Sequence, residues 1–287
     1  MSTFQGPPAP TADPLKPNIL RWDDIGLTLI HDFITETEEA VMIQAFHARD
    51  AAREGKKRVS QHFGHHFDYT TFGASETEYT PVPSYITDFL PRLPIQSYLP
   101  DQFTVQYYPP GTGIPPHVDT HSMFEEALYS LSFGSAVAMQ FRMSGSNDAR
   151  KMRLPKRSAA QEEGTPEPAA VPQTGDGDPE ERQKELTTNQ TSNEEQRLSW
   201  ELVLPPRSLL LMTGPSRYGY THAIRPRKTD TIEGEIVQRQ GRYSITMRTV
   251  RGGDEIGCDC AFPGVCDARI REEMAAACGK DKQVPRE

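Results

Sequence analysis

The sequence predicts an α+β fold, with helices first and an antiparallel sheet or barrel afterwards. Two observations support this class. Apolar residues recur at helical spacing before residue 90, and from residue 103 onward the period changes to two, in short runs separated by turns rich in Gly and Pro. Helices and strands segregated along a chain are typical of α+β domains. The 287 residues are enough for one large domain with additions or for two small ones.

Two helices are expected in the first third of the chain. The first lies near residues 35–53, where Thr35 and Glu38 form a capping-box pattern ahead of an apolar stripe. The second spans residues 83–90 and stops at Pro91, which lacks the amide hydrogen that a helix needs. Strands are expected at residues 103–108, twice within residues 127–143 around a Gly134-Ser135 turn, and at residues 200–205, 208–214 and 242–250.

One folded domain is expected, interrupted by an insertion, and it covers residues 19–143 and 199–270. Residues 144–198 are polar and poor in aromatic residues, so they cannot bury enough apolar area to offset the entropy of ordering. We interpret them as a disordered insertion between two strands. Residues 1–18 are predicted to be a disordered leader, and residues 271–287 a C-terminal tail.

The composition restricts the class of function. A net charge of −9 gives no global positive field for nucleic acid, so such binding would need a local patch. The polar N-terminus does not resemble a secretory signal, and no apolar run is long enough to span a membrane. All four cysteines lie in the last thirty residues, which indicates a cytoplasmic or nuclear protein with one local thiol site.

The segment PPHVDTHSMFEE, residues 115–126, concentrates residues that bind metals. His117 and Asp119 are two positions apart, so on an extended segment their side chains point to the same side. One imidazole and one carboxylate are two of the three ligands in the 2-His-1-carboxylate site that holds Fe(II). His222 is the candidate for the third ligand. The alternative is a hydrogen-bonded His-Asp pair in a loop.

Two arginines in RYSITMR predict a binding site for a dicarboxylate. Arg242 and Arg248 are six residues apart, so in a strand both face one side, with Cα atoms about 20 Å apart. With both side chains extended inward, the gap between them suits a five-carbon dicarboxylate such as 2-oxoglutarate, held by two bidentate clamps. The alternative is an exposed strand face with two solvated arginines.

The His-x-Asp pair, the distant histidine and the two arginines, in this order, resemble the AlkB family. Its members are Fe(II)- and 2-oxoglutarate-dependent dioxygenases that act mostly on nucleic-acid bases. The resemblance covers roughly residues 58–266 outside the insertion, and it implies a double-stranded β-helix (jelly-roll) core with supporting N-terminal helices. It also implies that Fe(II) is bound by His117, Asp119 and His222.

The resemblance assigns co-substrate residues as well. Arg242 would hold the distal carboxylate of 2-oxoglutarate, and Arg248 would lie near its keto-acid end. Tyr108, nine residues before the first iron-binding histidine, matches the tyrosine that hydrogen-bonds the co-substrate. Gln106 stands where the family usually has Asn, and Ser244 is a further candidate between the two arginines.

Longer stretches resemble one branch of the family. HVDTHSMFEEALYSLSFGS, PPRSLLLMTGPSRYGYTH and the cysteine tail are similar to the homologue that hydroxylates modified wobble uridines in tRNA. That homologue also carries an RNA-recognition module and a methyltransferase domain, and we expect no counterpart before residue 58 or after Cys278. RNA capture and methylation would then come from separate proteins, so tRNA and a tRNA methyltransferase are the expected partners.

A C-x-C-x5-C pattern is formed by Cys258, Cys260 and Cys266. Three thiolates favour Zn(II), which takes four ligands in a structural site. In the tRNA-modifying homologue the fourth ligand is the histidine two positions after the iron-binding aspartate, and that position is His121 here. The alternatives are Cys278 as the fourth ligand, or three unbound reduced cysteines.

The segment GKKRVSQHFGHHFDYTT, residues 55–71, mixes basic and aromatic residues. Basic groups can contact phosphate, and aromatic rings can stack on unpaired bases. The resemblance implies that this region is the lid over the target nucleotide, with the candidates Arg58, His62, Phe63 and Tyr69. The alternative is a solvated basic loop that leads into an ordinary strand.

Three functions therefore remain open. The first is hydroxylation of a wobble uridine modification in tRNA. The second is oxidative demethylation of alkylated RNA, DNA or protein, in which an oxidised N-methyl carbon leaves as formaldehyde. The third is an inactive, zinc-stabilised scaffold that binds RNA or a methyltransferase, and the complete set of iron ligands argues against it.

Overall fold

The computed structural model describes residues 9–13, 16–50, 59–68, 73–145, 199–251 and 257–280. Some predictions fall outside the described residues, namely those for residues 1–8 of the leader, for Arg58 and Tyr69, for residues 146–198 of the insertion, and for residues 281–287 of the tail. Among the described helices, none has the length and apolar character that crossing a membrane requires.

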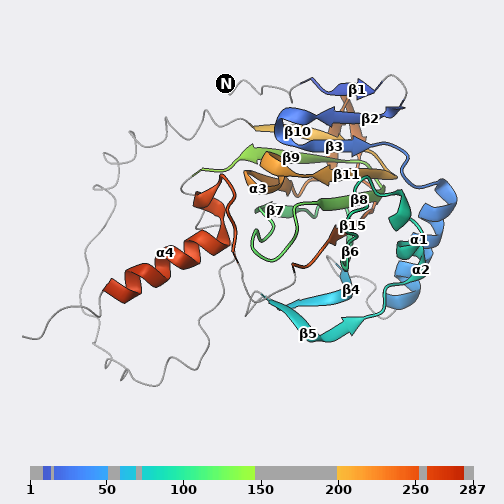
Figure 1. Ribbon diagram of the computed structural model, residues 1–287. Helices are drawn as coiled ribbons and strands as arrows, with labels where there is room; N and C mark the ends of the chain where they lie inside the picture. Colours follow the sequence, from blue (N-terminus) through green and yellow to red (C-terminus); the bar gives the residue numbers. More distant parts are fainter. Residues whose placement is uncertain are drawn as a thin grey trace, which may run out of the picture.

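Two antiparallel sheets face each other and form a jelly-roll core, so the expected fold class is confirmed (Figure 1). The larger sheet has the spatial order β1 (Thr11–Asp13), β2 (Lys16–Trp22), β3 (Leu27–Ile30), β11 (Ser208–Met212), β8 (Leu128–Gly134), β15 (Arg242–Arg248), β6 (Gln102–Tyr108), β4 (Val59–Asp68) and β5 (Gly73–Thr80). The smaller sheet has the order β10 (Ser199–Leu204), β9 (Val137–Met143), β12 (Tyr220–Ile224) and β7 (Ile114–His117). A separate hairpin consists of β13 (Thr229–Ile232) and β14 (Glu235–Gln238).

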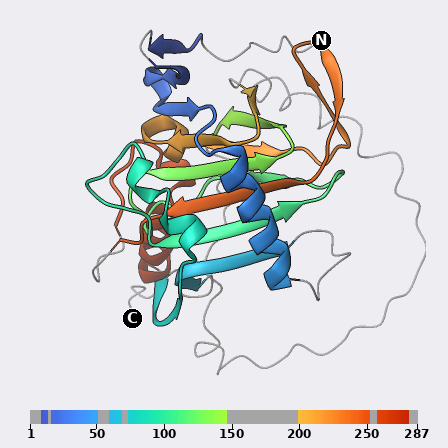
Figure 2. The ribbon, with the colours of Figure 1, turned by 90° about the vertical axis from the view of Figure 1, so that its right-hand side faces the viewer.

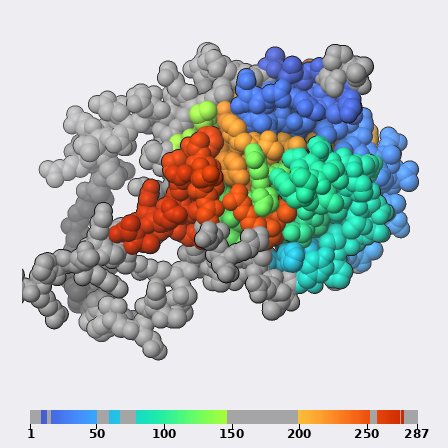
Figure 3. Space-filling model, viewed as in Figure 1, coloured from blue at the N-terminus to red at the C-terminus, as the bar shows by residue number. Residues whose placement is uncertain are grey.

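The helices lie outside the two sheets. They are α1 (Glu36–Asp50), α2 (Ser84–Thr87), α3 (Gly214–Tyr218) and α4 (Asp267–Lys280), with short 3-10 turns at Asp23–Ile25, Leu90–Arg92 and Pro263–Val265. Figure 2 shows α1 crossing the outer face of the larger sheet. Figure 3 shows α4 extending away from the body of the molecule, with its beginning against the core.

The first helix begins where the capping-box pattern predicts. The amide of Thr35 donates to Glu38 Oε2 at 2.7 Å, and the amide of Glu38 donates to Thr35 Oγ1 at 3.2 Å, so both amides are satisfied reciprocally. The second helix is shorter than expected. It ends at Thr87, and Pro91 lies in the 3-10 turn that follows.

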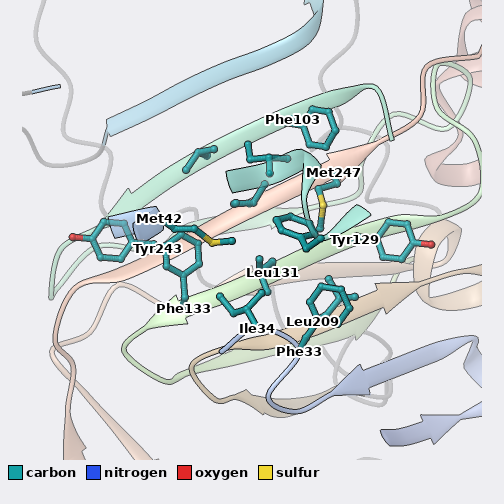
Figure 4. Packing of buried hydrophobic residues seen from close by; sticks show 14 of the residues in the cluster. Phe33, Ile34, Met42, Phe103, Tyr129, Leu131, Phe133, Leu209, Tyr243 and Met247 are labelled. Carbon is teal, nitrogen blue, oxygen red and sulfur yellow. The ribbon is translucent and has the colours of Figure 1, made fainter. Parts of the chain in front are cut away.

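Successive side chains of β15 point alternately into the apolar core and into a cavity. Tyr243, Ile245 and Met247 point to the side of α1, and Figure 4 shows Tyr243 beside Phe133 and Met42. The residues between them face the opposite way and line the cavity, namely Arg242, Ser244, Thr246 and Arg248. The predicted two-residue period of this strand therefore decides which side chains are available for chemistry.

A second apolar cluster lies between the two sheets. Leu128 and Leu210 of the larger sheet and Phe141 and Trp200 of the smaller sheet belong to it. The rings of Phe141 and Trp200 stack with centroids 4.5 Å apart. These contacts fix how the sheets face each other, and hence where the side chains between them lie.

The predicted turn at Gly134 carries the chain from the larger sheet to the smaller one. β8 pairs with β11 and β15, whereas β9 pairs with β10 and β12, so β8 and β9 do not form a hairpin. Gly134 has a φ of 81°, which glycine adopts without strain. In the pairing of β9 with β10, Ser199 lies opposite Arg142, so the expected insertion joins adjacent ends of two neighbouring strands.

Two domain boundaries differ from those expected. The leader expected over residues 1–18 is wrong for residues 11–13 and 16–18, because β1 pairs with β2 and β2 pairs with β3. Main-chain hydrogen bonds at the edge of the sheet order these residues although their side chains are mostly exposed. The boundary expected at residue 270 is also wrong, because it falls inside α4, which begins at the buried Asp267.

Candidate active site

A cavity of about 270 Å³ lies between the two sheets. Its polar lining comes mainly from β6, β12, β15, the end of β7 and the residues that follow β7. It brings together all eight residues predicted to bind iron or co-substrate: Gln106, Tyr108, His117, Asp119, His222, Arg242, Ser244 and Arg248.

Three possible metal ligands meet at this cavity. His117 ends β7 and lies opposite His222 of β12 in the antiparallel pairing, which brings the two ring centroids to 4.2 Å. Asp119 follows two residues after the strand ends. One ligand atom from each of the three residues lies within 4.8 Å of the others. A single strand pairing thus joins the His-x-Asp motif to a histidine from the second half of the chain.

The surroundings hold these groups in states that can bind a cation. Burial, followed by the charge of His117, lowers the pKa of His222 to about 3, so its imidazole is neutral at neutral pH. Burial alone would raise the pKa of Asp119, but Arg248 and the two histidines hold it below its usual range. His117 Nδ1 lies 2.9 Å from the carbonyl oxygen of Pro115, which favours a proton on Nδ1 and leaves Nε2 as the acceptor.

Arg248 is bound to the aspartate of this group. Its Nε and Nη2 donate to Asp119 Oδ1 at 2.8 and 2.5 Å, and its Nη1 donates to Gln102 Oε1 at 3.0 Å. The prediction from spacing, of two free guanidinium groups facing each other across the cavity, is therefore wrong. The reason is that the buried carboxylate needs a counter-charge, and Arg248 on β15 of the larger sheet supplies it across the cavity.

Arg242 has a different environment. It is 5% exposed, its Nη2 donates to Ser132 Oγ at 2.8 Å, and its guanidinium carbon lies 5.4 Å from the centre of the Tyr108 ring. Its Nε has no hydrogen-bond partner among the described residues. Burial lowers the pKa of Arg242 to about 10, and no carboxylate among the described residues offsets that effect. A buried cation in this state is costly unless an anion joins it.

The other predicted co-substrate residues lie beside Arg242. The Tyr108 hydroxyl donates to Gln106 Oε1, and Gln106 Nε2 donates to Ser60 Oγ at 3.2 Å. Ser244 faces the cavity from β15, opposite Gln106 in the strand pairing. These polar groups surround the side of the cavity where Arg242 is buried.

A second cluster of possible metal ligands adjoins the first along the chain, because His121 follows two residues after Asp119. His121 and three cysteines, Cys258, Cys260 and Cys266, each place one ligand atom within 4.8 Å of the others. His121 is fully buried, and its Nδ1 lies 3.4 Å from Cys260 Sγ. Burial raises the pKa of the Cys266 thiol to about 12, so in the absence of a cation this thiol stays protonated. The side chain of Cys278, the rival fourth ligand, lies outside the described residues.

Two residues at this site were not predicted. Arg217 of α3 donates to the carbonyl oxygens of Asp119 and Thr120, and Asp267 of α4 accepts from the amide of His121. Both side chains are buried. Nothing in the sequence distinguishes them from surface charges, apart from lying close to His222 and to the last clustered cysteine.

The expected lid is only partly in a position to contact a substrate. His62 lies at the cavity, with its Nδ1 3.3 Å from Thr104 Oγ1. Phe63 is the next residue of β4, so it points to the opposite face, where it is 1% exposed in the apolar core. The prediction that Phe63 stacks on a base is therefore wrong, because residues 59–64 pair with β6 as a regular strand.

The family follows from this fold and from a match along most of the sequence. The model of the 2OG-Fe(II) oxygenase superfamily matches residues 26–248. The chain belongs to this superfamily. It is therefore a 2-oxoglutarate-dependent dioxygenase, and the superfamily implies Fe(II) and 2-oxoglutarate as its cofactor and co-substrate.

Two relatives are similar in sequence to most of this chain. The tRNA (carboxymethyluridine(34)-5-O)-methyltransferase alkbh8 of Xenopus tropicalis is 30% identical over 268 residues, which cover 85% of this chain and 34% of the relative. The alkylated DNA repair protein ALKBH8 homolog of Arabidopsis thaliana is 30% identical over 254 residues, which cover 85% of this chain and 63% of the relative. The chain thus spans about one third of the length of the relative from Xenopus tropicalis and somewhat under two thirds of the length of the relative from Arabidopsis thaliana.

The resemblance to AlkB-like dioxygenases is therefore confirmed over most of the chain. Among solved structures, the chain is similar to OsALKBH1 with a TM-score of 0.45 and 13% sequence identity, covering 80% of this chain and 99% of that chain. Independently of these likenesses, the cavity residues fit the two groups. Two imidazoles and one carboxylate suit Fe(II), and the guanidinium of Arg242, which has no carboxylate partner among the described residues, suits a carboxylate.

Proposed function

We propose that this dioxygenase hydroxylates a modified wobble uridine of tRNA. The observation that carries the proposal is the meeting of His121 with Cys258, Cys260 and Cys266, two residues from the His-x-Asp motif. These four residues belong to the motifs in which the sequence resembles the tRNA-modifying branch of the family. The relative from Xenopus tropicalis has a name that refers to carboxymethyluridine at tRNA position 34, which supports a wobble base as the target.

In this proposal each polar group of the cavity has one role. His117, Asp119 and His222 hold Fe(II), and Arg242 binds the distal carboxylate of 2-oxoglutarate, with Tyr108 nearby. When bound, the iron and co-substrate supply an oxidation in which O₂ converts 2-oxoglutarate to succinate and carbon dioxide and places one oxygen atom on a substrate carbon.

The chain's own contribution is to bind, orient and exclude water. Asp119 is held ionised and fixed in direction by Arg248, and His222 is held neutral by burial. Arg242, which is almost fully buried, offers a charge where water has little access, so a carboxylate there gains more than it would in solvent. Arg248 lies at the same cavity but is bound to Asp119, so we assign it to the aspartate rather than to the co-substrate.

The second cluster is proposed to hold structural Zn(II), with His121, Cys258, Cys260 and Cys266 as its four ligands. Four ligands of this kind make a closed site with no open position for a substrate. The zinc would lower the pKa values of the thiols, which burial otherwise raises for Cys260 and Cys266. It would tie the beginning of α4 to the segment that presents the iron ligands.

RNA binding is proposed to depend on partners or on a local patch. The net charge of −9 gives the chain no general attraction for nucleic acid. Of the expected lid residues, His62 is exposed at the cavity, and it remains a candidate contact to the substrate together with Arg58 and Tyr69. A separate tRNA methyltransferase would complete the modification, and a cytoplasmic or nuclear location follows from the proposed substrate.

Mass spectrometry of tRNA nucleosides tests the proposal. Incubation of the purified protein with tRNA from a strain lacking it, with Fe(II) and 2-oxoglutarate, should release succinate and add one oxygen atom to a wobble uridine. His117→Ala should abolish both. Formaldehyde release with loss of a methyl group would instead identify a demethylase. Unchanged tRNA, with or without the protein, would refute the wobble uridine as the substrate.

A further inference from the structure

The residues 119–122 connect the two clusters. Asp119 belongs to the first cluster and His121 to the second, and only Thr120 separates them. Any shift of this short segment would move a ligand of one cluster relative to the other. The contacts that hold its backbone therefore bear on the geometry of both.

From one side, α3 holds the carbonyl groups of the segment. Arg217 is 2% exposed, its Nη1 donates to the carbonyl oxygen of Asp119 at 2.9 Å, and its Nη2 donates to that of Thr120 at 2.7 Å. The neighbouring Tyr218 packs its ring against His121, with centroids 5.0 Å apart. The strand that follows α3 carries His222, so α3 links the third possible iron ligand to this segment.

From the other side, α4 holds the amide groups. Asp267 is 1% exposed, and its Oδ1 accepts from the amide of His121 at 2.8 Å and from the amide of Ser122 at 3.1 Å. Its Oδ2 accepts from the Ser122 hydroxyl and from Arg271 Nη2, which lies 3.0 Å away. Asp267 is the first residue of α4, so the helix begins at this contact.

We infer that Arg217 and Asp267 form a backbone clamp that positions Asp119 for the iron site. The inference rests on the proposed assignment of iron to His117, Asp119 and His222. One guanidinium binds two consecutive carbonyls, and one carboxylate binds two consecutive amides, so two buried charges satisfy four backbone groups of one segment. Bonds to charged groups are the strong ones, and a buried charge left without them is costly, so the segment resists displacement.

The clamp acts separately from the zinc cluster. The seven polar atoms of its four hydrogen bonds are main-chain atoms of the segment and side-chain atoms of Arg217 and Asp267, and none of these atoms is a proposed zinc-binding atom. Removing zinc should therefore leave most of the iron-site geometry in place, whereas removing the clamp should disturb it with zinc still bound. Residues that orient metal ligands from behind typically change metal affinity by about 10- to 100-fold.

The test compares Arg217→Met, Arg217→Lys and Asp267→Asn in the full-length, zinc-loaded protein. Affinity for Mn(II), which takes the same nitrogen and oxygen ligands as Fe(II), is measured by electron paramagnetic resonance, together with zinc content and melting temperature. The matched control is Arg239→Met. Arg239 is also buried and donates to a carbonyl, that of Arg225, at 2.8 Å, but it does not touch the segment.

We expect Arg217→Met to weaken Mn(II) binding at least tenfold and Arg217→Lys to weaken it less. Arg239→Met should keep the Mn(II) affinity within about twofold of the wild-type value, although its melting temperature falls. If Arg217→Met does not fold, Arg217→Lys and Asp267→Asn decide, each with an expected loss of several-fold. Wild-type Mn(II) affinity in the clamp variants that fold would overturn the clamp. Wild-type affinity in Asp119→Ala would overturn the iron assignment itself.

Discussion

Replacing Arg242 with methionine should separate two effects of its buried charge, one on the stability of the protein and one on the binding of 2-oxoglutarate. In the structure the guanidinium is 5% exposed, with one hydrogen bond to Ser132 and no carboxylate partner among the described residues. Removing it relieves the cost of an uncompensated buried charge, which offsets the lost hydrogen bond of about 1 kcal/mol. The free energy of unfolding of the co-substrate-free protein should therefore stay unchanged or rise by about 1 kcal/mol.

The same substitution should greatly reduce the stabilisation by 2-oxoglutarate. A ligand at 100 times its Kd stabilises the wild-type protein by about 2.7 kcal/mol. Without Arg242, the distal carboxylate would be buried with no counter-charge, which costs about 3 kcal/mol and weakens binding roughly hundredfold. At the same concentration of 2-oxoglutarate the stabilisation of Arg242→Met should then shrink to about 0.4 kcal/mol.

Chemical denaturation without oxygen, with Mn(II) present and with or without 2-oxoglutarate, measures both quantities. The control is Arg239→Met, since Arg239 has a similar burial but donates to Asp230 at 2.5 and 2.9 Å. That variant should lose about 3 kcal/mol of stability and keep its response to 2-oxoglutarate. Two results would refute the reasoning. One is wild-type affinity of Arg242→Met for 2-oxoglutarate. The other is a loss of several kcal/mol in its free energy of unfolding when 2-oxoglutarate is absent.

Two further predictions concern the metal clusters. Cys260→Ser should lose its zinc while still binding one Mn(II) per chain, measured by elemental analysis and paramagnetic resonance; loss of both metals together would contradict separate sites. In the metal-free protein, burial lowers the pKa values of His121 and His222 from 6.5 to about 3. Between these values the unfolded chain binds protons that the folded chain does not, so stability should fall as the pH is lowered through this window. Denaturation of the chelator-treated protein at several pH values checks this, and a free energy of unfolding that does not fall would contradict it.

Spacing along the chain predicted the features that depend on neighbouring residues. The capping box at Thr35 and the two-residue period of the strand 242–248 follow from local backbone geometry, and both are present in the structure. The same period correctly predicted that Arg242 and Arg248 share one face. Local geometry can be derived from sequence because φ and ψ restrict each residue and its near neighbours in the same way in every fold.

Spacing did not predict which partner a side chain would find. Arg242 and Arg248 are alike in sequence, yet Arg242 has no carboxylate partner among the described residues, whereas Arg248 binds Asp119. No local pattern predicted that Arg217 is buried. Phe63 was predicted to contact a base because basic and aromatic residues surround it in the sequence, but it is buried in the core.

The sequence by itself therefore determined the list of chemical groups and the sides of the strands on which they stand. Only the tertiary structure decided that His222 lies opposite His117, that Asp267 meets the amide of His121, and that the edge of the large sheet includes part of the expected leader. The physical reason is that these contacts join residues far apart in the chain. Their energies depend on burial and on which opposite charge or vacant hydrogen-bonding group the fold brings near, and no local pattern encodes that.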